Sequence, residues 1–229
     1  MNYLKENLNK VIHGDCLEVM KKLPDNSVDL VLTDPPYGIG FGEFNRTNKT
    51  KSGERYKANK YKNSDWDDNI PSEEYFNEIQ RISKHQIIWG GNYFPCLWKK
   101  GCKGFIFWYK GNPVENFSDG ELAWTSFDKV AKQVNYRYYG NLEGGSSAID
   151  KTHPTQKPVE LMVWCLENYL MKDWRKKEGN ERPVIFDGFA GSGTTAVAAK
   201  KCGCDFILVE TEEEYVKDCN QRLSQETMF

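Results

Sequence analysis

The hexapeptide TDPPYG at residues 33–38 joins an acid, two prolines and an aromatic ring directly after the apolar run at 28–32. Neither proline has an N–H, and each fixes its own φ, so a strand cannot continue through this point. Such a turn is either the entry to an ordinary loop, with Asp34 as a turn cap and Tyr37 as a rim aromatic, or a rigid catalytic ledge. The hexapeptide alone leaves both interpretations open.

A second candidate site follows the strand-like residues 183–186, in the sequence DGFAGSGTT at 187–195. Glycines there let the backbone approach a ligand closely, and the helix that follows offers unpaired N–H groups at its start. The loop lacks the lysine of a phosphate-binding loop and the spacing of a dinucleotide fingerprint. Asp187 before the glycines suits an ammonium or sulfonium group, and Glu210, after the next strand, lies where an acid reaches ribose hydroxyls. We therefore predict a nucleoside-like, cationic ligand without a pyrophosphate.

The elements that must position these residues alternate between strands and helices. Apolar or β-branched runs typical of buried parallel strands occupy 10–14, 28–33, 86–90, 104–109, 122–127, 183–188 and 205–210. Helical patterns lie at 16–23, 72–84, 158–172, 194–201 and 212–226. This order predicts a doubly wound α/β fold with a mostly parallel sheet, in which ligands bind beyond the carboxyl ends of the strands. At 229 residues, a single domain spanning 1–229 is expected.

Composition and charge narrow the function classes. No run approaches eighteen apolar residues, and the first residues lack a signal-peptide core, which predicts a cytoplasmic protein without a membrane partner. Seven cysteines without a C-x-x-C pair argue against a metal site. The net charge is −2, but residues 41–62 carry seven Lys or Arg against two Glu. One concentrated basic segment suits a polyanion, although a solvated surface gives the same pattern.

Two stretches interrupt the alternation of strands and helices. Residues 41–70 are polar and basic, and we interpret them as a long mobile loop that follows the TDPPYG turn. Residues 128–152 contain Tyr136, Arg137, Tyr138 and Tyr139, and they are interpreted as an aromatic and basic insert rather than a helix–strand unit.

Three motifs in this order, TDPPYG, HPTQKPVELM at 153–162 and FDGFAGSGTT at 186–195, resemble those of the amino-group DNA methyltransferases that use S-adenosylmethionine. The catalytic motif precedes the cofactor motif, which is the circularly permuted arrangement of their beta class. The resemblance also covers 13–38, 87–94 and 105–112, and so spans nearly the whole chain. It implies a Rossmann-like methyltransferase fold with seven strands, one of them antiparallel.

The resemblance implies roles for individual residues. Asp34 and the carbonyl of Pro35 would accept the hydrogens of an exocyclic amine, and Tyr37 would stack on the base. The catalytic residues that follow from it are Asp34, Pro35, Pro36 and Tyr37. The cofactor-binding residues that follow from it are Asp15, Cys16, Asp34, Thr155, Lys157, Asp187, Phe189, Gly191, Ser192, Gly193, Thr194, Thr195 and Glu210. Among these, Asp15 would lie at the adenine of the cofactor, Glu210 on its ribose, and Thr155 and Lys157 over the methionine tail.

Double-stranded DNA is the expected partner, and the target base must be flipped out of the duplex to be reached. The residues expected to contact nucleic acid are Arg46, Lys49, Lys51, Arg55, Lys57, Tyr136, Arg137 and Tyr138. For the tyrosine cluster, a structural role at a sheet edge is an equal alternative. From the resemblance, residues 128–152 are expected to be the target-recognition region, which is short for this family. This leaves the recognition sequence, a homodimer and a cognate restriction enzyme open.

In the family that the chain resembles, an acid before -PPY favours N6 of adenine, and serine there favours N4 of cytosine. Cytosine-N4 methylation is therefore the nearest alternative, and RNA or protein amides would be favoured by asparagine at that place. A DNA-binding or regulatory module that keeps the fold without turnover is the alternative from another class.

Overall fold

The structure is a computed structural model that describes residues 3–39, 69–111, 118–137, 156–176 and 181–225. Its strands are β1 (Lys10–His13), β2 (Val28–Thr33), β3 (Ser83–Trp89), β4 (Phe105–Tyr109), β5 (Gly120–Thr125), β6 (Lys132–Asn135), β7 (Val184–Asp187) and β8 (Asp205–Glu210). Its α-helices are α1 (Tyr3–Glu6), α2 (Cys16–Met20), α4 (Glu73–Ile82), α5 (Val159–Leu166), α6 (Lys172–Trp174), α7 (Thr194–Cys202) and α8 (Glu213–Gln225). The 3-10 helices η1 (Gly91–Tyr93) and η2 (Pro95–Trp98) follow β3, and the π-helical turn η3 (Glu167–Met171) joins α5 to α6.

Within the described residues the strands form one eight-stranded sheet in the order β1-β8-β7-β2-β3-β5-β4-β6. Strand β5 runs antiparallel to its neighbours β3 and β4, and the remaining pairs are parallel. The predicted mostly parallel α/β fold and its antiparallel strand are confirmed, but the predicted number of seven strands was wrong.

The eighth strand is β6, which pairs with β4 at the edge of the sheet. It lies in the segment 128–152, which was interpreted as an insert rather than a helix–strand unit, and for which a structural role at a sheet edge was the stated alternative. Residues 132–135 form such an edge strand. Its sequence, KQVN, turns only Val134 into the core, so it carries too little apolar pattern to be recognised as a strand.

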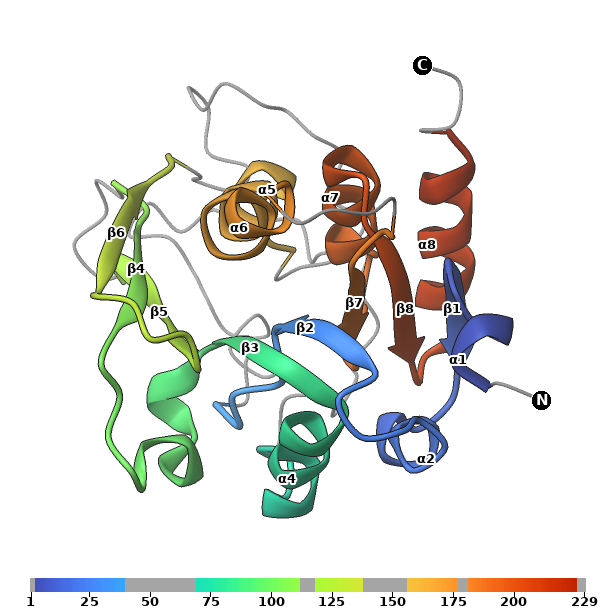
Figure 1. Ribbon diagram of the computed structural model, residues 1–229, viewed down its shortest axis with the longest axis horizontal. Coiled ribbons are helices and arrows are strands. Elements are labelled where there is room, and N and C mark those ends of the chain that lie inside the picture. Colours follow the sequence, from blue (N-terminus) through green and yellow to red (C-terminus); the bar gives the residue numbers. More distant parts are fainter. Residues whose placement is uncertain (1–2, 40–68, 112–117, 138–155, 177–180, 226–229) are drawn as a thin grey trace, which may run out of the picture.

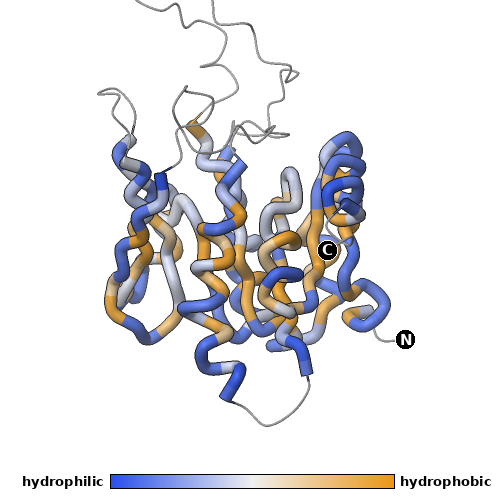
Figure 2. The backbone as a smooth tube through the Cα atoms, turned by 90° about the horizontal axis from the view of Figure 1, so that it is seen from above, coloured by the Kyte–Doolittle hydropathy of each residue, from blue (hydrophilic) through white to orange (hydrophobic). Residues whose placement is uncertain are grey.

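Helices cover both faces of the sheet (Figure 1). Successive side chains of a strand point to opposite faces, so Leu32 packs on the side of α5 and α7, and Val31 packs on the side of α2 and α4. The central strand β2 is buried along its whole length, which explains its nearly continuous apolar sequence. Figure 2 shows hydrophobic residues concentrated along the inner segments and hydrophilic ones on the outer helices.

The sheet positions the two predicted motifs side by side. Strands β2 and β7 are adjacent and parallel, so the TDPPYG turn after β2 and the glycine loop after β7 leave the same edge of the sheet. From β2 the chain passes to β3 on one side, and from β7 it passes to β8 on the other. This is a topological switch point, where doubly wound sheets open a crevice for ligands.

The predicted loop 41–70 lies outside the described residues apart from its last two positions, and so do residues 138–152 of the predicted insert. None of the helices in the described ranges combines the length and the apolar character needed to cross a membrane.

Candidate active site

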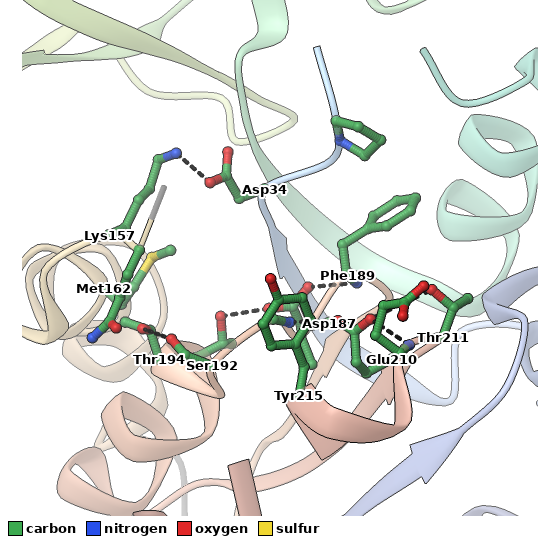
Figure 3. A pocket seen from close by; sticks show the side chains of 16 residues that line it. Asp34, Lys157, Met162, Asp187, Phe189, Ser192, Thr194, Glu210, Thr211 and Tyr215 are labelled. Carbon is green, nitrogen blue, oxygen red and sulfur yellow. Dashed lines mark hydrogen bonds and ion pairs between the residues drawn. The ribbon is translucent and has the colours of Figure 1, made fainter. Parts of the chain in front are cut away.

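A cavity of about 380 Å³ opens beyond the carboxyl ends of β2 and β7 (Figure 3). In that view Asp34 and Lys157 lie at one side of the cavity, and Glu210 and Thr211 lie at the other. Its lining residues are Asp34, Pro36, Gln156, Lys157, Met162, Asp187, Phe189, Ala190, Gly191, Ser192, Thr194, Thr195, Glu210, Thr211, Glu212 and Tyr215. The cavity therefore brings together the predicted catalytic acid and most of the predicted cofactor-binding residues.

The glycine loop forms one wall of the cavity. Gly191 and Gly193 have φ values of +49° and +76°, in the left-handed region that favours glycine. At Gly193 a Cβ atom would also lie 2.2 Å from Sγ of Cys219 on α8, so no larger residue fits there. Arg222 of α8 donates to the carbonyl oxygen of Ser192 at 3.0 Å and to Oγ1 of Thr194 at 3.3 Å. The last helix, α8, thus holds the glycine loop in position.

Asp187 ends β7 and is buried, with 3% of its surface exposed. Its Oδ1 accepts from the Thr33 hydroxyl at 2.7 Å and from the backbone N–H of Phe189 at 3.0 Å, and its Oδ2 accepts from the Thr195 hydroxyl at 2.6 Å. Burial raises the pKa of Asp187 to about 6 despite these three donors. A cationic group bound nearby would favour the ionised form.

Glu210 ends β8 on the opposite side of the cavity and is also buried. Its Oε2 accepts from the N–H of Gly191 at 2.7 Å, and its Oε1 accepts from the N–H of Glu212 at 2.9 Å. In the described part of the chain, Asp187 and Glu210 are thus held by N–H and hydroxyl groups rather than by cations. This part of the cavity disfavours phosphate and favours a ligand that brings hydroxyls and positive charge.

The TDPPYG turn holds Asp34 at the rim of the cavity. Its Oδ1 accepts from the hydroxyl of Tyr37 at 2.6 Å, and its Oδ2 forms an ion pair with Lys157. Burial raises the pKa of Asp34 above its ordinary value; Lys157 opposes this rise and Glu121 adds to it. The carboxylate, the proline-fixed backbone and the ring therefore form one rigid unit.

The ring of Tyr37 stacks on Tyr93 with a centroid distance of 4.8 Å and an interplanar angle of 14°. It passes over Gly90, where a Cβ atom would lie only 2.0 Å from the ring. Burial and the carboxylate of Asp34 raise the pKa of the Tyr37 hydroxyl, so this hydroxyl stays protonated and donates its hydrogen bond to Asp34. Tyr93 therefore covers one face of the Tyr37 ring. The expected stacking of a base on Tyr37 stays a prediction.

Two predicted cofactor residues lie elsewhere. Asp15 is exposed and caps α2 by accepting from the N–H groups of Leu17 at 2.7 Å and Glu18 at 3.2 Å. Cys16 is buried beside Gly188, and burial raises its pKa to about 12. Neither residue lines the cavity, so their predicted contact with the cofactor has no support from this geometry.

Of the other predicted catalytic and nucleic-acid residues, some are described by the structure and the others are not. Pro36 lines the cavity, and Pro35 is buried and is not among the lining residues. Tyr136 follows the edge strand β6, where its hydroxyl donates to Glu160 at 3.2 Å and its carbonyl accepts from Trp108 at 2.8 Å. This position matches the structural alternative for the tyrosine cluster, and Arg137 follows it as an exposed residue. The remaining predicted residues, Arg46, Lys49, Lys51, Arg55, Lys57, Tyr138 and Thr155, lie outside the described residues.

Sequence reasoning missed several residues of the site. Gln156 and Met162 belong to the HPTQKPVELM motif and could have been found there, whereas Tyr215 lines the cavity without belonging to a recognised motif. Glu121 forms an ion pair with Lys157 across 3.1 Å. Within the described residues, no group of three or more His, Cys, Asp or Glu could hold a metal ion.

Comparison with known proteins assigns the chain to a family. The sequence model of a DNA methylase family matches residues 88–221. The type II methyltransferase M2.DpnII of Streptococcus pneumoniae is 28% identical over 265 residues, which cover 98% of this chain and 92% of that protein.

Two solved structures share the fold. The M1.HpyAVI–SAM complex matches 93% of this chain and 98% of its own, with a TM-score of 0.55 and 23% identity. The cytosine-N4-specific PvuII DNA methyltransferase matches 93% of this chain and 85% of its own, with a TM-score of 0.57 and 17% identity. With more than half of its length matched by the family model, and with this fold, the chain belongs to the DNA methylase family.

Proposed function

We propose that this DNA methylase transfers a methyl group from S-adenosylmethionine to N6 of an adenine that is flipped out of double-stranded DNA. The observation that carries the proposal is that Asp34, on its proline-fixed turn, lines the same cavity as the glycine loop, Asp187 and Glu210. An acceptor for amine hydrogens and a site for a cationic nucleoside therefore adjoin, as direct transfer between two bound molecules requires.

The residues of the cavity fit S-adenosylmethionine. The volume of the cavity, about 380 Å³, lies in the range of small-molecule sites. Glu210 suits ribose hydroxyls, Asp187 suits a positively charged group, and Met162, Phe189 and Pro36 provide apolar walls. The bound sulfonium would supply an electrophilic methyl group, which is the chemistry that the side chains themselves lack.

The chain's own contribution is alignment. The exocyclic amine of a base is a poor nucleophile because its lone pair is delocalised into the ring. Asp34 and the carbonyl of Pro35 are the acceptors that would draw its hydrogens to one side, so that the lone pair faces the methyl group. Because Oδ2 of Asp34 is held by Lys157, the amine has to share this carboxylate with the lysine.

The choice of adenine rests on the acid of the DPPY turn. The fold is shared with the cytosine-N4-specific PvuII enzyme, so the fold does not decide between the two bases. Cytosine N4 is therefore the alternative acceptor. Double-stranded DNA is the proposed substrate, and a homodimer and a cognate restriction enzyme stay predictions.

The catalytic assignment is tested with purified wild-type and Asp34→Ala protein, duplex DNA and S-adenosylmethionine labelled in its methyl group. We expect Asp34→Ala to abolish incorporation of label into DNA while its calorimetric affinity for S-adenosylmethionine falls only slightly. A variant that kept the wild-type rate would refute the role of Asp34, and label transferred only to competing RNA or protein would refute the substrate.

A further inference from the structure

Lys157 is the most enclosed cation of the described site, with 6% of its side chain exposed. Its ammonium contacts three groups: a carboxylate oxygen of Asp34, Oε2 of Glu121 at 3.1 Å and the hydroxyl of Tyr37 at 3.1 Å. Glu121 lies on the antiparallel strand β5 and does not line the cavity. Lys157 is thus shared between the proposed catalytic acid, Asp34, and a second carboxylate, Glu121.

Glu121 is itself held from the other side. Its Oε1 forms an ion pair with Lys110, which follows β4, and both of these side chains are about three-quarters buried, with 22% of Lys110 and 23% of Glu121 exposed. Four charges of alternating sign therefore run inward from the sheet edge, in the order Lys110, Glu121, Lys157 and Asp34. Two are positive and two are negative, so the row is neutral as a whole.

The position of Lys157 sets how freely Asp34 can accept a new hydrogen bond. A lysine paired only with Asp34 would make a charge-assisted contact that a neutral amine displaces poorly. A second carboxylate weakens that contact because the ammonium is attracted in both directions. It also offers the ammonium a partner when the amine arrives, so that no charge is left buried and unpaired.

We propose that Glu121 is a positioning residue of the methyl transfer: it draws Lys157 away from Asp34 and receives it when the substrate amine binds. This inference rests on the proposed function of Asp34. The ion pair with Lys110 keeps Glu121 in place. It thereby limits how far the Lys157 ammonium can move from Asp34 toward Glu121.

The pKa shifts of the charged residues in this row agree with the proposed role of Glu121. Burial raises the pKa of Glu121, but Lys157 and Lys110 outweigh burial and lower it to about 2, so Glu121 stays anionic at every working pH. Burial lowers the pKa of Lys157, yet Asp34 and Glu121 together raise it above its ordinary value. Asp34 interacts with the titratable groups of Tyr37, Glu121, Lys157 and Asp187. Tyr93 stacks on Tyr37, and Lys110 pairs with Glu121.

The test compares three variants in the full chain: Glu121→Gln, Lys110→Met and the control Glu73→Gln. The control removes a surface carboxylate of α4 that pairs with Lys99, so it loses an exposed Lys–Glu ion pair that shares no residue with the row. Each protein is measured for kcat at saturating DNA and S-adenosylmethionine across pH, and for its affinity for S-adenosylmethionine by calorimetry.

Glu121→Gln is expected to lower kcat roughly tenfold, because coupling within one charge network is of that size. The affinity for S-adenosylmethionine should stay within about twofold, because Glu121 lies outside the cavity. Removing the carboxylate lowers the pKa of Asp34, so the acid limb of the kcat profile moves to lower pH. Lys110→Met frees Glu121 to take Lys157 from Asp34, so its acid limb moves to higher pH. Glu73→Gln should match the wild type.

Opposite shifts of the acid limb are a signature that loss of structure does not produce. Unchanged kcat and pH profile in Glu121→Gln, with an active wild type, would refute this inference and leave the proposed function intact. A wild type without transfer to DNA would instead refute the proposed function. If Glu121→Gln did not fold, Glu121→Asp decides: partial activity with the wild-type acid limb supports the role, and full activity overturns it.

Discussion

Replacing Gly90 by alanine should displace the ring of Tyr37 and so disturb the turn that carries Asp34. Gly90 has φ +67°, where a side chain costs roughly 1–2 kcal/mol. The new Cβ would lie 2.0 Å from Cε1 of Tyr37, whereas carbon atoms pack at about 3.5 Å, so the ring must move by about 1.5 Å. Relief of such an overlap costs about 1–3 kcal/mol. We expect the free energy of unfolding to fall by about 2–5 kcal/mol in total.

The same movement reaches the active site. The hydroxyl of Tyr37 lies 2.6 Å from Oδ1 of Asp34, and a shift of more than 1 Å breaks this hydrogen bond. Misplacement of a catalytic group by about 1 Å costs up to about a hundredfold in rate. In a radiolabel transfer assay, kcat of Gly90→Ala should therefore fall by about tenfold to a hundredfold at a temperature where the variant is folded.

Gly101 provides the matched control for Gly90→Ala. Its φ of +71° imposes the same backbone strain, but a Cβ there would meet nothing within 4 Å. Gly101→Ala should lose only about 1–2 kcal/mol of stability and keep the wild-type kcat. Combining Gly90→Ala with Tyr37→Ala should remove the contact part of the cost. A Gly90→Ala enzyme with wild-type kcat would refute the dependence of Asp34 on the ring of Tyr37.

Three further predictions concern the cavity and the core. The pKa of Asp187 is about 6 in the folded chain and near 3.8 in the unfolded one. The ligand-free protein should therefore lose about 3 kcal/mol of its free energy of unfolding as pH rises between those values. Urea unfolding should show this loss in the wild type, and Asp187→Asn should remove it. Arg222→Leu releases the glycine loop, so the calorimetric Kd for S-adenosylmethionine should rise roughly tenfold, whereas an unchanged Kd would exclude a positioning role for α8. Cys16, Cys165, Cys202, Cys204 and Cys219 are buried, so a thiol reagent followed by mass spectrometry should modify only Cys96 and Cys102 in the native chain and all seven thiols after unfolding; rapid native labelling of Cys165 would contradict the packing.

The central sheet could be predicted from the sequence because its strands are buried on both faces. Such strands are nearly continuous apolar runs, and β2 and β8 begin and end at their predicted residues. The predicted helix 72–84 was two residues too long at its end, because the chain passes directly from Ile82 into β3. At the edge of the sheet, β6 needs only one buried residue, and its pattern is correspondingly weak.

The cavity could be predicted where its residues follow one another in short motifs. The turn after β2 and the loop after β7 carry Asp34, Asp187 and the glycines in contiguous segments, and adjacency of two parallel strands brings them together. The partners of Asp34 could not be predicted in the same way. Lys157 was assigned to the cofactor and does line the cavity, but its ion pairs with Asp34 and with Glu121 of β5 could not be foreseen, nor could the pair of Glu121 with Lys110, which follows β4. A pairing across strands leaves no mark at a fixed spacing in one sequence.

The choice of base and the role of Asp34 are tested together by one measurement. DNA from a host that expresses the wild-type chain, and from the same host with Asp34→Ala, is digested and its nucleosides are quantified by mass spectrometry. Our account predicts N6-methyladenine above the host background with the wild type and not with the variant. N4-methylcytosine in its place, or no modified base at all, would contradict it.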